Sequence, residues 1–137
     1  MKQIFILKEP INKISSPEDL FKKIKKIKVD FEQENFILIC LNTANQIIKS
    51  EIVFKGALSE CIISPQTIFK KALKCNAKSI IIGHNHPSKN LNPSQEDRQI
   101  YKILKEGAKL LNIQILDNII FNKKEFYSFN SEGLKDE

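Results

Sequence analysis

Residues 79–88 read Ser-Ile-Ile-Ile-Gly-His-Asn-His-Pro-Ser, a short apolar run that leads directly into two histidines. The three isoleucines are β-branched and predict a buried strand. Alternate residues of a strand point to the same face, so the side chains of His84 and His86 are expected to converge. Imidazole nitrogens are ordinary zinc ligands, so the end of this strand is the first candidate for a functional site.

The sequence after the histidines supplies a carboxylate at the start of a helix. Apolar residues at helical spacing run to about Leu111 and predict a helix that begins at Ser94. Ser94 and Asp97 have the spacing of a capping box, which explains both residues through helix stability alone. A first-turn aspartate can also turn its carboxylate toward a metal, so both interpretations stay open. With His84 and His86, Asp97 would give the three protein ligands of a catalytic zinc site.

The remaining sequence predicts strands that alternate with helices, as in a single α/β domain with a mixed sheet flanked by helices. The predicted helices begin at N-capping serines and cover Ser16 to about Lys28, Gln66 to about Cys75, and Ser94 to about Leu111. The predicted strands, besides 79–82, cover 36–41, 46–54, 113–116, 119–121 and 125–129, with a short edge strand at 4–7 in an N-terminal extension, 1–15. The expected buried faces are Ile68, Phe69 and Leu73 in the middle helix and Ile100, Ile103, Leu104, Ala108 and Leu111 in the last.

Composition narrows the class of protein. The chain has 137 residues, enough for one domain, and a net charge of +6. Lysines at 22–28 interleave with apolar residues and predict the solvated face of an amphipathic helix, while a nucleic-acid partner is the alternative interpretation.

The sequence has neither a membrane-spanning run nor a signal peptide, so we expect no membrane association. Cys40, Cys61 and Cys75 form no metal-binding pair and are expected to be buried thiols in a reducing cytoplasm.

The spacing from His84 to Asp97 resembles a known metalloprotease signature. His84-x-His86, seven residues, Ser94, two residues and Asp97 match the JAMM (JAB/MPN+) pattern, and the residues between them resemble its RadC branch. Similar segments lie at 54–58, 64–73, 116–120 and 127–134, so the resemblance covers about residues 16–135. It implies a RadC-like JAB/MPN domain over 16–137, with a fold similar in outline to the cytidine deaminases.

The resemblance also implies a chemistry. His84, His86 and Asp97 would hold one zinc ion per chain, and Glu34, just before the strand at 36–41, would be the general base. Ser94 would donate a hydrogen bond to the oxyanion during hydrolysis of a peptide or isopeptide bond in an unidentified protein or peptide substrate. The alternatives are Glu32 as the base, and a non-catalytic, metal-stabilised binding module associated with DNA repair or recombination. A zinc nucleobase deaminase is excluded, because the chain lacks the His-x-Glu and Pro-Cys-x-x-Cys motifs.

The chain departs from the RadC pattern at several positions. Lys89 stands where a glycine is usual, Asn42 where an aspartate is usual, and Asn118 where a histidine is usual. Lys89 is expected to alter the loop or to place a cation at the mouth of the site, and Asn118 removes any role of that histidine. The resemblance is to short stand-alone forms, without the helix-hairpin-helix region that precedes the domain in longer relatives.

Overall fold

The structure, a computed structural model, describes residues 13–56 and 63–131. The predicted strand at 4–7 and Cys61 lie outside these residues. The described elements, in chain order, are α1 (Pro17–Ile24), β1 (Asn35–Leu41), β2 (Ile47–Lys55), α2 (Pro65–Lys74), β3 (Ser79–Asn85), α3 (Gln95–Leu110), β4 (Gln114–Phe121) and β5 (Phe126–Ser128).

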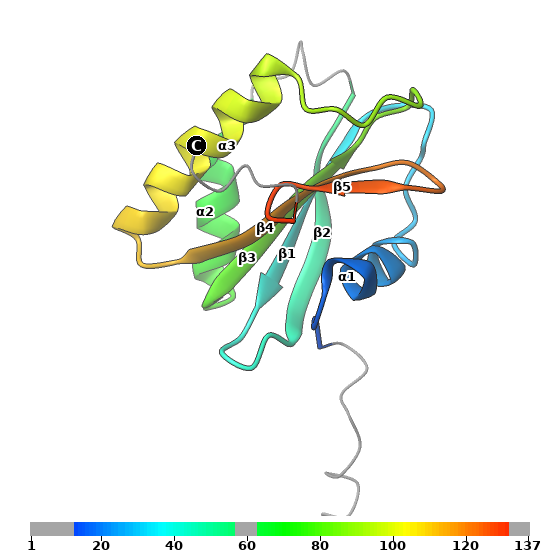
Figure 1. The fold of residues 1–137 in the computed structure, drawn as a ribbon. Helices are drawn as coiled ribbons and strands as arrows, with labels where there is room; N and C mark the ends of the chain where they lie inside the picture. Colours follow the sequence, from blue (N-terminus) through cyan, green and yellow to red (C-terminus); the bar gives the residue numbers. More distant parts are fainter. Residues whose placement is uncertain (1–12, 57–62, 132–137) are drawn as a thin grey trace, which may run out of the picture.

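A five-stranded mixed sheet carries the histidines on its central strand. The strand order is β2-β1-β3-β4-β5, and every neighbouring pair is antiparallel except β3 and β4. The parallel pair is connected by α3, because parallel strands need a crossover. Helices α2 and α3 cover one face of the sheet and α1 covers the other (Figure 1). The predicted α/β class with a mixed, helix-flanked sheet is confirmed.

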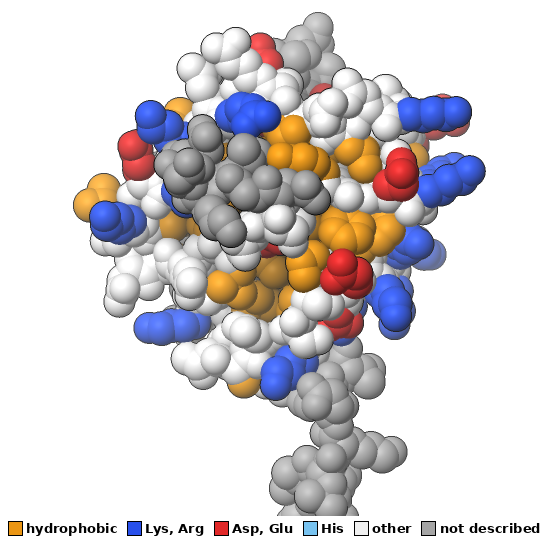
Figure 2. Space-filling model, viewed as in Figure 1, with side chains coloured by type: hydrophobic (Ala, Val, Ile, Leu, Met, Phe, Trp, Pro, Cys, Tyr) orange, Lys and Arg blue, Asp and Glu red, His pale blue; other side chains and the backbone are white. Residues whose placement is uncertain are grey.

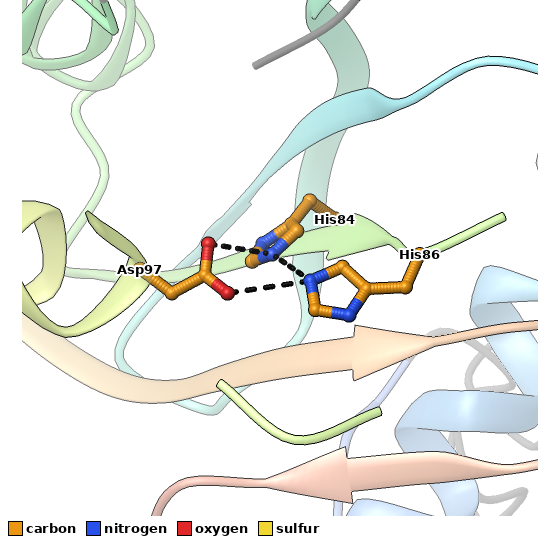
Figure 3. A group of neighbouring side chains, drawn as sticks. All are labelled: His84, His86 and Asp97. Atoms are coloured by element: carbon orange, nitrogen blue, oxygen red, sulfur yellow. Dashed lines mark hydrogen bonds and ion pairs between the residues drawn. The ribbon is translucent and has the colours of Figure 1, made fainter. Parts of the chain in front are cut away.

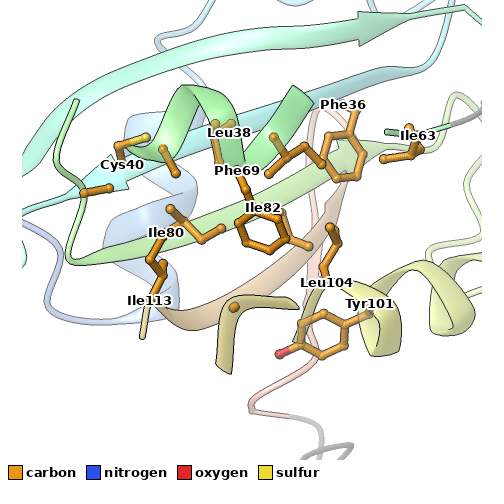
Figure 4. Close-up of a cluster of buried hydrophobic side chains, with 14 of the residues drawn as sticks. Phe36, Leu38, Cys40, Ile63, Phe69, Ile80, Ile82, Tyr101, Leu104 and Ile113 are labelled. Carbon is orange, nitrogen blue, oxygen red and sulfur yellow. The ribbon is translucent and has the colours of Figure 1, made fainter. Parts of the chain in front are cut away.

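Two apolar cores hold the layers together. Phe36, Leu38 and Ile82 of the sheet pack against α2 and α3 (Figure 4), whereas Ile37 and Ile81 pack against α1 on the other face. Strand β1 is therefore buried along its whole length, as its unbroken apolar run predicted.

The cysteines agree in part with the prediction of buried thiols. Cys40 is buried and Cys75 is half-buried. Burial is the main cause that raises the pKa of the Cys40 thiol to about 12, and the hydrogen bond with Cys75 also raises it.

The helix starts are as predicted, but one helix end is not. Ser16, Ser64 and Ser94 each accept a hydrogen bond from a first-turn backbone N–H, so all three are N-caps. The prediction that α1 reaches Lys28 is wrong, since α1 ends at Ile24. Beyond it the backbone N–H groups of residues 26 and 27 bond to the carbonyls three residues earlier, so a tighter turn replaces the α-helical ladder.

The strands predicted at 113–116 and 119–121 are one strand, β4. The β3–β4 register shifts by one residue at the break in the apolar pattern, since Ile80 pairs with Ile115 and Ile81 pairs with Asp117. The expected interruption, Asp117, is buried in the strand, where its carboxylate accepts hydrogen bonds from the hydroxyl of Ser128 and the backbone N–H groups of Asn118 and Asn130. A polar residue in the gap between the two predicted strands therefore ties β4 to the end of β5.

The buried faces of α2 and α3 differ from those predicted. Ala72 is buried in α2 in place of Leu73, and Tyr101 is buried in α3 in place of Ile103 and Leu111. The two helices approach each other closely at Gly107, where an added Cβ would lie 2.8 Å from the ring of Phe69. Any side chain at this position would require the ring of Phe69 to shift, so the glycine permits the close contact.

Charged side chains are distributed without a single basic patch on the face shown in Figure 2. Lysine and arginine side chains lie mostly around its rim, several of them along the right side, with acidic, apolar and uncharged atoms between them. In the N-terminal helix the apolar residues Leu20, Phe21 and Ile24 are buried, and the neighbouring Lys22 is exposed, as predicted. None of the helices in the two described ranges is long and apolar enough to cross a membrane.

Candidate metal centre

The end of β3 and the start of α3 bring three side chains to one point (Figure 3). Nε2 of His84 lies 3.1 Å from Nε2 of His86 and 3.1 Å from Oδ1 of Asp97. Nε2 of His86 lies 3.3 Å from Oδ2 of Asp97. The side chain of His84 is 4% exposed, and those of His86 and Asp97 are 14% and 13% exposed. The centre is therefore largely shielded from water but open on one side.

Local contacts orient both imidazole rings. Nδ1 of His86 lies 2.9 Å from the carbonyl of Asn90, and because a carbonyl only accepts, Nδ1 is the donor. In the neutral ring this leaves the lone pair on Nε2, facing Asp97. The ring of His84 is stacked on Phe36, with 6.3 Å between the ring centroids and 6° between the planes. Nδ1 of His84 and Oδ1 of Asn118 are both buried, and neither has a hydrogen-bond partner within the described ranges.

Asp97 serves the helix and the centre at once. Its backbone N–H donates to Oγ of Ser94, and its Oδ2 accepts from the backbone N–H of Ser94, which completes a capping box. The same carboxylate faces both histidines. The two interpretations of the Ser94/Asp97 spacing are therefore compatible, because one geometry satisfies the helix end and points the carboxylate into the site.

The three donors fit a small divalent cation. A tetrahedral zinc with bonds of about 2.0–2.1 Å separates its ligand atoms by roughly 3.3 Å. The two Nε2 atoms lie 3.1 Å apart, and each lies 3.1–3.3 Å from one of the two carboxylate oxygens of Asp97. Two imidazole nitrogens and one carboxylate oxygen are a donor set that zinc accepts, and the open side leaves room for a fourth ligand. His84, His86 and Asp97 thus form a candidate metal site, with the residues and spacing predicted.

The electrostatics of the centre favour a bound cation. Burial opposes ionisation of Asp97, but hydrogen bonds from His84 and His86 outweigh it and hold the pKa of the carboxyl well below its usual range. The hydrogen bond to Asp97 raises the pKa of His86, although burial lowers it. The charge of Glu34 also raises this pKa. Without a metal, the centre therefore attracts a proton to His86.

These shifts predict opposite pH dependences for the metal-free and metal-bound protein. The stabilisation from the raised pKa of His86 is present below its unfolded value, 6.5, and is lost as the pH rises through the folded value. The thermal midpoint measured in chelator should therefore fall as the pH rises above 6.5. Zinc affinity should rise over the same range, because the metal displaces that proton. A His86→Ala variant should lose this part of the pH dependence, and an unchanged pH profile would contradict the assignment.

A cleft of about 900 Å³ opens onto the candidate metal centre. Glu34 and Ser94, the residues expected to act as base and oxyanion donor, both line it together with the three candidate ligands. Glu34 is half-buried directly before β1, two residues from Phe36 and on the same face. Glu32, the alternative base, also lines the cleft but is exposed in the preceding turn. The structure thus brings every predicted site residue to one cleft.

Sequence reasoning missed two contributors to the site. The carbonyl of Asn90 orients His86, and a backbone group leaves no trace in residue type. Asn85, between the two histidines, is fully buried and bonds to the segment that carries Glu34. Its partners lie 50 and 52 residues away, so only the placement of a polar residue at the end of a buried strand hinted at a role.

Of the three departures from the RadC pattern, one lines the cleft. Asn118 is buried in the wall of the cleft, where its side chain is among those that line it. Lys89 is exposed in the loop that follows His86 and is absent from the residues that line the cleft within the described ranges. The third, Asn42, lies beyond the far end of β1, where its side chain organises the turn into β2.

The fold and the centre define an α/β domain with a His-x-His…Asp candidate metal site. Residues 14–134 match the family model described as the RadC-like JAB domain, so the chain belongs to that family. It is 37% identical over 133 residues to a UPF0758 protein of Chlorobium chlorochromatii, with 97% of this chain and 60% of the relative covered. It is 42% identical to a UPF0758 protein of Methanosarcina mazei, with 93% of this chain and 56% of the relative covered. It is 40% identical to a UPF0758 protein of Staphylococcus haemolyticus, with 90% of this chain and 54% of the relative covered. The chain thus spans little more than half the length of these relatives.

Proposed function

We propose that the domain is a zinc-dependent peptidase that cleaves a peptide or isopeptide bond. The observation that carries the proposal is the convergence of His84, His86 and Asp97 in a cleft that also holds Glu34 and Ser94. Zinc held by the three ligands would supply Lewis acidity toward a carbonyl and a water with a pKa near 7. The other requirements of amide hydrolysis fall to residues of the chain.

Glu34 and Ser94 would perform the proton transfer and the charge stabilisation. The carboxylate of Glu34 takes a proton from the attacking water and returns it to the leaving amine. Ser94 Oγ accepts a hydrogen bond from the backbone N–H of Asp97, which leaves its hydroxyl hydrogen available to donate to the oxyanion. The capping contact holds the hydroxyl in place before substrate arrives, so its orientation costs little during the reaction.

The charge of the cleft favours a peptide over a nucleic acid. Four carboxylates, those of Glu32, Glu34, Glu96 and Asp97, line it, and no lysine or arginine does so within the described ranges. This composition contrasts with the net charge of +6 for the chain. Phosphate groups would be repelled by these carboxylates, whereas a neutral or basic peptide segment would not.

A cleavage assay on a peptide library tests the proposed function. The protein is stripped with chelator, reloaded with one equivalent of zinc, and incubated with proteome-derived peptides and with isopeptide-linked conjugates. New amino termini are then identified by mass spectrometry. We expect cleavage with the reloaded protein alone and none with the stripped protein. Stoichiometric zinc without cleavage of any substrate would overturn the proposal and favour a non-catalytic, metal-stabilised module associated with DNA repair.

A further inference from the structure

Asn85 connects the histidine strand to the segment that carries Glu34. Its Oδ1 accepts a hydrogen bond from the backbone N–H of Asn35 at 2.7 Å, and its Nδ2 donates to the carbonyl of Gln33 at 2.9 Å. These two backbone groups belong to the residues on either side of Glu34. A third contact, from the backbone N–H of Gly56 to the carbonyl of Glu34, holds the same segment from the residue that follows β2.

The position of Asn85 in β3 makes this connection geometrically direct. His84 and His86 point to the cleft, so Asn85 points to the other face of the strand. Asn35 likewise alternates with Glu34 and Phe36, and neither asparagine lines the cleft, whereas Glu34 does. Both asparagines are fully buried, and the amide of Asn35 donates in turn to Oδ1 of Asn85. A side chain placed in this way does not contact substrate and acts only through the backbone.

We propose that Asn85 is a positioning residue that sets the distance between the carboxylate of Glu34 and the metal centre. This inference rests on the proposed role of Glu34 as the base. One residue fixes both parts of the machinery, because the strand that carries His84 and His86 also holds the peptide groups on both sides of Glu34. A shift of about 1 Å in such a group lowers turnover by about 100-fold.

The test compares Asn85→Ala and Asn85→Asp with Asn42→Ala. Asn42 is a matched control, since its side chain also makes three hydrogen bonds, in a turn beyond the opposite end of β1. We expect Asn85→Ala to lower kcat by about 100-fold while KM and zinc content change less than about threefold. Asn85→Asp keeps the acceptor for the Asn35 N–H and should be intermediate, and Asn42→Ala should leave kcat unchanged.

A second readout separates this inference from the proposed function. Hydrogen exchange of the Asn35 amide and a crystal structure of each variant report the placement of Glu34 without any substrate. In Asn85→Ala that amide should exchange faster, and the Glu34 carboxylate should move away from His86. If wild type cleaves nothing, the proposed function fails, and the placement data alone decide on Asn85. Wild-type kcat in Asn85→Ala, or an unmoved Glu34, would overturn the inference.

Discussion

A Glu34→Gln variant is expected to bind zinc as tightly as wild type and to hydrolyse peptide about 10³-fold more slowly. The amide preserves the size of the side chain but cannot accept the proton of the attacking water, and general-base catalysis contributes roughly 10²–10⁴-fold. Glu34 is not among the three candidate ligands, so the metal should stay in place. The measurement is kcat/KM on a peptide identified as a substrate, together with zinc content by elemental analysis.

The matched control for this change is Glu32→Gln. Glu32 carries the same charge and lines the same cleft, but it is exposed in the turn before the segment held by Asn85. We expect less than about a fivefold change in kcat/KM, since an exposed charge at the rim of a cleft acts mainly on association. If instead Glu32→Gln abolished turnover and Glu34→Gln did not, the assignment of the base would be reversed. If both substitutions changed kcat/KM by equally small factors, neither residue would be the general base.

Local sequence signals sufficed for much of the fold and for two of the ligands. Strand β1 was visible as an unbroken apolar run, and each helix start followed a serine with a hydrogen-bonding side chain. The convergence of His84 and His86 followed from strand alternation alone. Asp97 differs from them: its spacing from Ser94 was explained by a helix cap alone, a metal ligand stayed an open alternative, and the resemblance to the RadC pattern was needed to favour that alternative.

The parts that sequence could not predict depend on contacts between distant segments. The close contact between Gly107 of α3 and the ring of Phe69 of α2 is not encoded in any apolar periodicity. The continuity of β4 depends on the burial of Asp117 by hydrogen bonds from the end of β5. The hydrogen bonds of Asn85 to the peptide groups on both sides of Glu34 join residues about 50 positions apart. In each case the residue type was visible but its partner was not.

Loss of a single candidate ligand should remove the metal. We expect His86→Ala and Asp97→Asn each to lower zinc affinity by more than about 100-fold, because loss of an outer partner of a ligand alone costs 10–100-fold. Asp97→Asn is the more informative change, since its amide oxygen can still accept from the backbone N–H of Ser94 and preserve the helix start. Zinc affinity is measured by competition with a chromophoric chelator.

Thermal unfolding of the same variants separates metal loss from misfolding. Zinc at 1,000 times its dissociation constant stabilises the folded state by about 4 kcal/mol, so wild type should show a large rise in Tm on zinc addition. His86→Ala and Asp97→Asn should melt cooperatively without that rise. Gln99→Ala is the control, because Gln99 lines the same cleft but is not a candidate ligand, and it should respond like wild type. A full zinc response in Asp97→Asn would show that the carboxylate caps the helix without holding a metal, and the centre would then lack its third ligand.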